Sequence, residues 1–252
     1  MKTLEFQCGE EIISVSVTRS KRKSMTISIG IDGEVKVKAP QMLSDAELLK
    51  WVKSKTGWIV RKRNEMLKNP KRCEQKKYVS GEQFLFLGEA YCLEVRTSEA
   101  RAGTVGITED KLVVFVKEAE VFLAEGEAEE IIKYQQIIKQ YLACWYEKQA
   151  HIWIPRRVRH YASVVDETFS RIFIKNQKSR WGSCSSARNM NFNWRLMMAP
   201  LEVLDYVVVH ELCHLKEMNH SKEFWAEVEK VLPDYKERKK WLDENGKLLT
   251  LS

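Results

Sequence analysis

Two histidines and a glutamate between Val207 and Trp225 have the spacing of a metal-hydrolase site. His210 and His214 are four residues apart, so on a helix their rings lie one above the other and can share one ion. Glu211 lies beside them. In a His-Glu-x-x-His arrangement the imidazoles hold Zn²⁺, and the adjacent carboxylate takes a proton from the metal-bound water. The pattern predicts a zinc hydrolase in which Glu211 is the general base.

A catalytic zinc needs a third protein ligand and one open position for water. His220 is the first candidate, because its spacing from His214 equals that of the third histidine in the metzincin pattern His-Glu-x-x-His-x-x-Gly-x-x-His. Glu217 stands at the glycine position of that pattern, and Asn219, which tolerates a left-handed conformation, is expected to turn the chain instead.

Three glutamates compete with His220 for the place of third ligand. Glu217 lies about 10 Å along a helix from His210, which is too far for one ion to reach both histidines and this carboxylate. Glu223 or Glu227, on the helix expected next, would give the two-histidine, one-glutamate site of thermolysin-like enzymes.

The six cysteines contain no Cys-x-x-Cys pair, which argues against a zinc ribbon or a disulfide framework. Cys213 lies inside the histidine motif at a position that faces away from the ligands, so we expect it in the core. Cys184 is a weak candidate nucleophile.

The sequence predicts a cytoplasmic protein without a membrane span. The thiols are expected to be reduced, the amino terminus does not resemble a signal peptide, and no apolar run reaches roughly 18 residues.

The formal net charge of +7 is unevenly distributed along the chain. Residues 19–77 hold 17 Lys or Arg against 6 Asp or Glu, a local charge of +11. This segment could meet a nucleic acid or another acidic partner. A solvated surface is the simpler interpretation, because no aromatic-interleaved RNA motif accompanies the charge.

Alternating apolar and polar residues predict strands in the amino-terminal half. Ser44 and Glu47 form a capping box that begins a helix, which is expected to reach about Lys68. The strands are expected at 12–17, 25–31 and 35–37, as a β-meander with a hairpin at Asp32-Gly33, and at 83–87, 91–95, 104–107 and 111–115, as a second antiparallel sheet or an extension of the first.

A long amphipathic helix is predicted from Glu125 to about Ile152, with Pro155 ending it. A strand at 168–175, a turn at 180–185 and a return strand at 190–196 then lead to the helix that begins near Pro200 and delivers the histidines. The predicted fold class is therefore α+β. Residues 1–120 are expected to form a β-rich amino-terminal domain that contains one helix, and residues 121–252 a zinc-peptidase domain.

Several separate motifs resemble the YgjP-like family of zinc-dependent metallopeptidases, which is related to WLM and SprT-like proteases. The segments from Arg19 to Pro40 and at Trp58-Ile59 are also similar to that family, so the resemblance covers nearly the whole chain. The motifs are Lys178-Ser-Arg-Trp-Gly-Ser-Cys184, Asn193-Trp-Arg-Leu196, Ala199-Pro200, Asp205-Tyr-Val-Val-Val-His-Glu-Leu-Cys-His214, Asn219-His-Ser221 and Phe224-Trp225.

The resemblance implies a minimal gluzincin-like catalytic domain at the carboxyl end, with His210, His214 and His220 as zinc ligands and Glu211 as the acid/base. It implies no particular substrate. SprT-like DNA-repair proteases often carry a carboxyl-terminal zinc ribbon, and this chain has no cysteine pair to form one.

The turn before the metal helix is the expected substrate site. Related peptidases keep an edge strand at this place, so we expect an extended peptide to pair with Trp181, Gly182 and Ser183, with Arg180 as a carbonyl or carboxylate contact. A packed hairpin with Trp181 and Trp194 in the core is an equal alternative for the tryptophans. Arg195 and Tyr235 are further candidates for contacts to substrate, the latter to an oxyanion.

The sequence thus predicts a zinc metallopeptidase that hydrolyses a peptide or protein. One competing hypothesis is a nucleic-acid-associated binding protein, in which the basic segment at 19–77 does the binding and the zinc is structural. Another is a scaffold that zinc merely stabilises.

Overall fold

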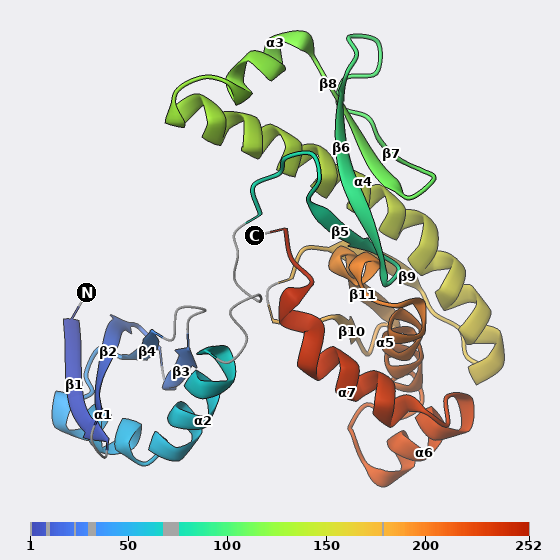
Figure 1. Ribbon diagram of the computed structural model, residues 1–252. Helices are drawn as coiled ribbons and strands as arrows, with labels where there is room; N and C mark the ends of the chain where they lie inside the picture. Colours follow the sequence, from blue (N-terminus) through green and yellow to red (C-terminus); the bar gives the residue numbers. More distant parts are fainter. Residues whose placement is uncertain are drawn as a thin grey trace. The chain divides into compact units, whose positions relative to one another are not determined.

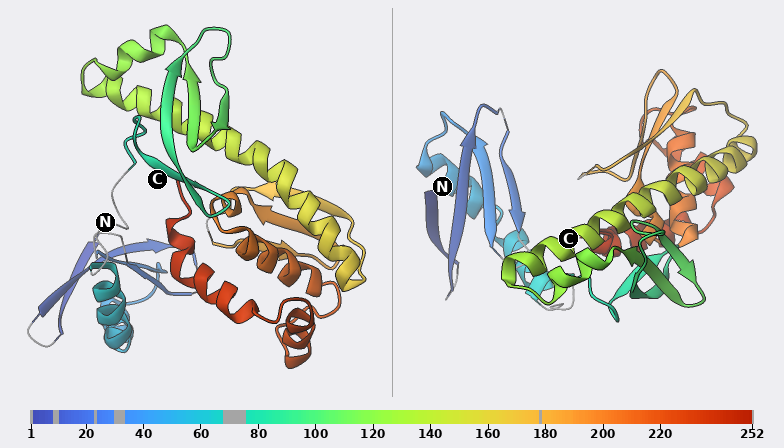
Figure 2. Two further views of the ribbon diagram at one scale, coloured as in Figure 1. Left: turned by 45° about the vertical axis from the view of Figure 1, so that its right-hand side comes forward. Right: turned by 90° about the horizontal axis from the view of Figure 1, so that it is seen from above.

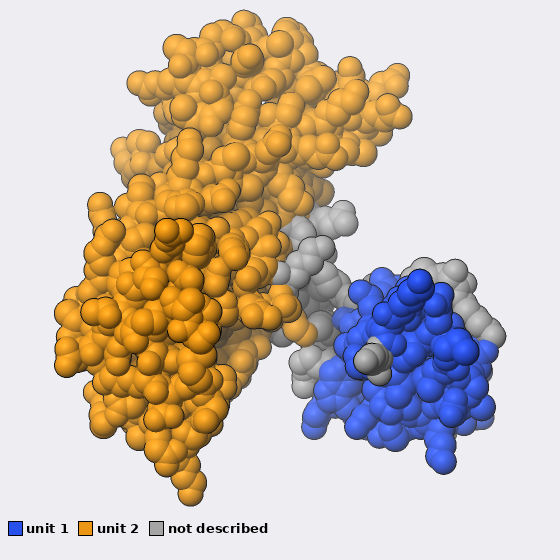
Figure 3. Space-filling view, turned by 180° about the vertical axis from the view of Figure 1, so that it is seen from behind, with its two compact units in different colours: residues 1–75 blue, residues 76–252 orange. Residues whose placement is uncertain are grey.

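The computed structural model describes residues 2–8, 11–22, 24–29, 34–67, 76–177 and 179–251. The chain forms two compact units, residues 1–75 and 76–252, which Figure 3 colours separately. The sequence placed the boundary at 120/121, whereas the units divide at 75/76. The difference arises because the strands between residues 83 and 116 share one hydrophobic core with the carboxyl-terminal helices.

Unit 1 contains a four-stranded sheet whose order is β1-β2-β4-β3. The predicted β-meander is wrong, because β2 pairs with β4 in parallel and β3 lies beyond β4 at the edge. The predicted turn at Asp32-Gly33 lies outside the described residues. The strands are β1 (Lys2–Cys8), β2 (Glu11–Ser20), β3 (Thr26–Ile29) and β4 (Val35–Pro40).

Two helices, α1 (Asp45–Lys53) and α2 (Thr56–Leu67), cover this sheet with Leu48, Val52 and Ile59 in the shared core. The capping box predicted for α1 is confirmed. The single helix predicted to continue to Lys68 is wrong, because the chain leaves the helical path between α1 and α2. Ser and Thr hydroxyls there bond to carbonyls of the preceding turn and compete with the helical ladder.

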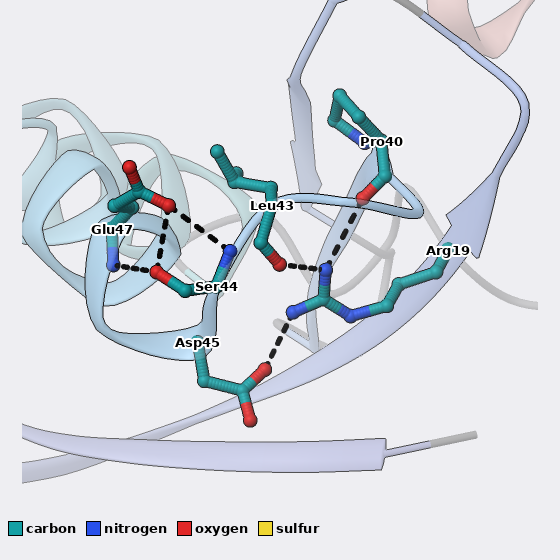
Figure 4. A network of polar contacts seen from close by, with 6 residues as sticks. All are labelled: Arg19, Pro40, Leu43, Ser44, Asp45 and Glu47. Carbon is teal, nitrogen blue, oxygen red and sulfur yellow. Dashed lines mark hydrogen bonds and ion pairs between the residues drawn. The ribbon is translucent and has the colours of Figure 1, made fainter.

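Arg19 at the end of β2 is held by the segment that leads into α1 (Figure 4). Its Nη1 donates to the carbonyl oxygens of Pro40, at 3.1 Å, and Leu43, and its Nη2 lies 2.5 Å from Oδ1 of Asp45. One cation of the basic segment therefore stabilises the connection between sheet and helix.

Unit 2 begins with a second sheet, of order β5-β6-β8-β7, and the four strands predicted for this region are present. It is a separate, mixed sheet and not an antiparallel one, because β6 and β8 run parallel. The strands are β5 (Gln83–Phe86), β6 (Glu89–Thr97), β7 (Val105–Thr108) and β8 (Lys111–Val116), followed by the short helices α3 (Glu118–Val121) and η2 (Phe122–Ala124).

The helix α4 (Ala128–Val165) spans 38 residues and joins the two halves of unit 2 (Figure 1). The prediction that Pro155 ends this helix is wrong. Proline removes one hydrogen bond from the ladder, but buried side chains lie on both sides of it, Leu142 and Ile154 before and Val158 after. Packing of this inward face stabilises the helix beyond the proline.

The second half of α4 runs beside a third sheet and the helix that carries the histidines (Figure 2). The sheet order is β10-β11-β9, and β11 is parallel to β9, so the predicted antiparallel return strand is wrong. The remaining elements are β9 (Arg171–Lys175), β10 (Gly182–Cys184), β11 (Asn189–Asn193), η3 (Trp194–Met198), α5 (Leu201–Cys213), α6 (Lys222–Val231), α7 (Tyr235–Asn245) and η4 (Gly246–Leu248).

The mixture of helices and strands confirms the predicted α+β class. Across the part of the chain that the structure describes, no helix combines the length and the apolar character needed to cross a membrane.

Candidate metal centre

The helix α5 runs through the core of unit 2 and brings the sequence motif to its end. All residues from Val203 to Val209 are buried. The helix is therefore surrounded by protein on all sides, and its sequence is almost continuously apolar, whereas a surface helix has apolar residues on one side only. The helix ends at Cys213, and His214 is its C-cap residue. His210 and Glu211 therefore leave the last turn of a rigidly packed helix.

A partly buried ion pair connects α5 to α4. Arg157 Nε lies 2.6 Å from Asp205 Oδ1, and Arg157 Nη2 donates to Asp205 Oδ2 at 2.7 Å. Tyr161 adds a third bond to the same carboxylate, at 3.1 Å. Asp205 precedes His210 by five residues, so this planar bidentate contact holds the segment from which the histidines project. Arg157 was not among the residues singled out from the sequence, because it lies beyond the predicted end of α4.

His210, His214 and His220 form a group that could hold one metal ion, with ligand atoms within 4.8 Å of one another. The Nε2 atoms of His210 and His220 face each other at 3.0 Å. His214 Nδ1 lies 3.0 Å from the carbonyl oxygen of Glu217, so it carries the proton and leaves the Nε2 lone pair free for a metal. The three side chains thus bring together three imidazole nitrogens, a donor type that zinc prefers.

The short segment after α5 brings His220 back to the helix. The Asn219 side chain accepts a bond from Ser221 N–H at 3.1 Å, and the Ser221 hydroxyl accepts one from Phe224 N–H at the start of α6. This N-cap sets the position of α6, and it places His220 over His210.

Aromatic rings pack around the three imidazoles. The fully buried Phe224 ring has its centroid 5.0 Å from that of His210, 4.5 Å from that of His214 and 4.9 Å from that of His220. Trp225 lies against His210 and His220, and it also stacks on Tyr235, with the ring centroids 5.2 Å apart. Tyr235, a sequence candidate for an oxyanion contact, therefore packs against Trp225.

Glu211 is buried beside the histidine group, with 5% of its surface exposed. Burial raises the pKa of its carboxyl to about 8, although Arg180 and a bond from the backbone N–H of Cys184 act in the opposite direction. Its Oε2 atom has no hydrogen-bond partner among the described residues. A buried carboxyl oxygen without a partner is a place where a ligand or a water would bind.

Burial also favours the neutral forms of His210 and His214. It is the largest cause that lowers the pKa of His210 to about 3, followed by the charges of His214 and His220. The pKa of His214 is lowered mainly by burial as well. Neutral imidazole is the form that binds a metal, so the donor set fits a divalent cation.

The three glutamates that competed for the third ligand position make other contacts. Glu217 contributes its backbone carbonyl to His214. Glu227 pairs with Lys216, at 3.2 Å, and with Lys230. The Ser221 side chain bonds to Glu223 and lowers the pKa of its carboxyl.

The strand β10 lies at an edge of its sheet: among the described strands only β11 pairs with it, so its other side is open to pairing, and the strand contacts α5. Trp181 and Ser185 bond to β11: Asn193 N–H donates to the Trp181 carbonyl, and Ser185 N–H donates to the Asn189 carbonyl. In an antiparallel pair, every second residue bonds to the neighbouring strand and the residues between them face away. The peptide groups of Gly182 and Cys184 therefore face the open side. The Cys184 N–H is used by Glu211. The N–H and C=O of Gly182 therefore point to the open edge beside the candidate site.

The residues predicted to bind substrate separate into two groups. Trp181 and Gly182 line a pocket with His210 and Glu211. The Ser183 hydroxyl instead accepts a bond from Asn191 at 3.2 Å, on the other face of the sheet. Arg180 is exposed and lies near enough to Glu211 to lower the pKa of that carboxyl.

The pocket has a volume of about 230 Å³ and extends from Glu211 along α5. The sequence did not indicate its far wall, which comes from Lys239, Leu242 and Asp243 of α7. No spacing rule connects α7 with the histidine motif, because only tertiary packing brings the two helices together.

The remaining sequence candidates are placed in packing environments. Cys213 is fully buried, as predicted. Burial raises the pKa of the Cys184 thiol to about 11, which disfavours the thiolate needed in a nucleophile. Arg195 lies over the Trp194 ring, and desolvation lowers the pKa of its guanidinium.

An α+β fold with a buried glutamate beside a three-histidine group is the arrangement of a metal-dependent hydrolase. A family model described as YgjP-like, metallopeptidase domain, matches residues 23–245. The chain belongs to this family, which confirms the resemblance stated from its motifs.

Among solved structures, a similar chain is the metallopeptidase zymogen abylysin of Pyrococcus abyssi, at 24% identity and a TM-score of 0.34. The match covers 36% of this chain and 93% of that one. No curated protein matches the sequence.

Proposed function

We propose that this protein is a zinc metallopeptidase that hydrolyses peptide bonds of a peptide or protein substrate. The convergence of three imidazoles beside the buried Glu211 carboxyl carries the proposal. His210, His214 and His220 are the proposed ligands. When bound, zinc supplies a Lewis acid that polarises the scissile carbonyl and acidifies the attacking water.

Glu211 is the proposed general base. Its partnerless Oε2 is available to take a proton from the attacking water, while the Cys184 N–H orients the carboxylate. The same carboxyl then donates the proton to the leaving amine. Burial raises the pKa of this carboxyl above the ordinary value of a glutamate, which favours a group that must return the proton it has accepted.

The open edge of β10 is the proposed substrate platform. An extended peptide that pairs with Gly182 would lie alongside Glu211, because Gly182 and Glu211 line one pocket. Arg180 and Trp181 would flank this peptide. Ser183, whose side chain faces Asn191, would act only through its backbone position in the strand.

The deciding experiment measures bound zinc and cleavage of an unfolded reporter protein for the wild type, Glu211→Gln and His220→Ala. We expect Glu211→Gln to keep zinc and to lose about 10²- to 10⁴-fold in cleavage rate. His220→Ala should lose both. Cleavage by Glu211→Gln at the wild-type rate would exclude the mechanism.

Matched controls separate the proposed ligands from neighbouring side chains of the same type. Glu223→Gln and Glu227→Gln should keep zinc and activity, because these carboxylates pair with other groups. His151 lies exposed on α4, so His151→Ala should also change neither. Retention of zinc by His220→Ala together with its loss in either glutamate variant would instead assign a glutamate as the third ligand.

The hypothesis of a nucleic-acid-associated protein predicts a different result. It requires salt-dependent DNA retention that disappears when Lys21, Arg22 and Lys23 are neutralised, without proteolysis. Arg19 bonds to Asp45, and Arg22 donates to Ser24 at 3.3 Å and to Thr26, so part of the charge is engaged within unit 1.

We further propose that the protein works in the cytoplasm. Cys92, Cys144, Cys184 and Cys213 are free thiols, as expected in a reducing compartment. Rapid thiol alkylation in intact cells should modify the exposed Cys144, and its recovery in a disulfide would contradict this location.

A further inference from the structure

Apolar side chains contribute much of the lining of the pocket beside Glu211. Tyr206, Val207 and Leu242 line it and are themselves no more than 8% exposed. Two charged side chains of α7 also line it, and Lys239 Nζ lies 2.7 Å from Asp243 Oδ2. These two charges pair with each other, so neither is left as an isolated charge for a ligand.

The aromatic wall of the pocket is held in place from behind. A Cβ atom on the buried Gly246 would lie 3.0 Å from Cζ2 of Trp181, so the indole packs directly on the backbone that follows α7. Trp181 therefore spans from the proposed substrate strand to the carboxyl-terminal helix. Part of its indole therefore lies against this backbone, and the residue also lines the pocket.

The size of the pocket limits what can enter it. Sites for complete small-molecule ligands are usually about 300–1,000 Å³, whereas this one measures about 230 Å³. One large side chain fits such a volume better than a whole ligand. Because the pocket shares His210 and Glu211 with the candidate metal centre, the side chain inside it must belong to a residue close to the reacting peptide group.

We propose that this pocket selects substrates by receiving one bulky apolar side chain, from a residue directly flanking the scissile bond. Successive residues of an extended peptide rise about 3.3 Å and point to opposite sides, so a more distant residue would not reach it from the edge of β10. The inference rests on the proposed peptidase function and extends it to substrate class. Leu242 of α7 is the specificity-determining residue.

The first test uses the full-length, zinc-loaded protein and peptides that differ at one position beside the cleaved bond. Replacing Phe or Leu there by Gly, Asp or Lys should lower kcat/KM by about 10- to 100-fold. Peptides cleaved within about threefold of one another would overturn the inference.

A substitution on α7 tests the residue assignment. Leu242→Trp should fill the pocket and reduce cleavage of the Phe peptide by about 10-fold or more relative to an Ala peptide. Lys240→Trp places the same side chain at an exposed position of α7 and should leave the preference unchanged. An unchanged preference in a folded Leu242→Trp protein would contradict the assignment.

Direct binding separates failure of this inference from failure of the proposed function. N-acetylphenylalaninamide and N-acetylglycinamide are titrated into the zinc-loaded wild type and followed by NMR. Selective binding of the phenylalanine compound, with shifts at Trp181, supports the pocket even when no peptide is cleaved. Equal affinity for the two compounds overturns it, whatever the protease assay shows.

Discussion

Gly182 lies so close to Glu211 that a Cβ atom on Gly182 would come within 2.6 Å of Glu211 Oε1 and 2.7 Å of Cγ. Any larger residue would displace the proposed general base. Gly182 begins strand β10, so no turn at this position explains the glycine. The close approach of Glu211 on α5 explains it instead, because there is no room for a Cβ atom.

Gly182→Ala should therefore reduce cleavage while zinc remains bound. We expect a loss of about 10²-fold or more, because small displacements of a reacting group have effects of this size. The measurements are kcat/KM and bound zinc. Gly106→Ala on β7 is the control, since no atom lies within 4 Å of a Cβ placed there. Equal effects of the two variants would contradict a special role for Gly182.

The ion pair between Arg157 and Asp205 should stabilise unit 2. Asp205→Asn removes the charge opposite a guanidinium that is one quarter exposed, so the free energy of unfolding should fall by about 2–3 kcal/mol, less than for a fully buried pair. Denaturant unfolding measures the change. Asp234→Asn, which breaks an exposed pair with Arg238, should cost less than about 0.5 kcal/mol. Comparable losses would contradict the role assigned to Asp205.

Zinc should raise the melting temperature of the wild type. Binding to the folded state alone adds about 2.7 kcal/mol at a free-ion concentration 100 times Kd. His220→Ala should lose this response, whereas His151→Ala on α4 should keep it. Thermal unfolding with and without a chelator measures the effect, and an undiminished zinc response in His220→Ala would remove this residue from the ligand set.

The stability of the metal-free protein should fall between pH 6.5 and 8. The folded protein holds a proton on Glu211 up to a pKa of about 8, whereas the unfolded chain releases it near the ordinary value of 4.5. The folded state therefore binds more protons in this range, and its advantage decreases as pH rises. The lowered pKa of His210 acts with the opposite sign, but only below about pH 6.5.

Glu211→Gln removes this contribution and serves as the comparison. The wild type should lose about 1–2 kcal/mol more than the variant between pH 6.5 and 8. Denaturant unfolding in the presence of a chelator gives both curves. Parallel curves would show that Glu211 titrates at the same pH in the folded and unfolded chains.

Local rules predicted the elements whose causes are local. The capping box of Ser44 and Glu47 begins α1 because both partners lie within one helical turn. The strands of the second sheet were found from alternation. The same rules failed at Pro155, where the cost of a proline inside a helix is offset by burial of Ile154 and Val158 in a core that the sequence does not display.

Strand pairing was the main error, for a related reason. Alternation predicts that a segment is a strand but not which strand lies beside it, so β2 and β4, β6 and β8, and β9 and β11 were not expected to run parallel. These parallel pairs need connections that cross other elements, and tertiary packing selects them.

The sequence by itself determined the chemistry proposed for this protein, because His210, Glu211 and His214 lie within one turn and a half of helix. Tertiary structure decided what no spacing could supply: the return of His220 to His210, the Gly182 contact that orients Glu211, and the wall that Leu242 adds to the pocket. Each of these depends on the contacts that α5 makes with β10, α6 and α7, because these segments lie apart in the sequence and meet only in the folded protein.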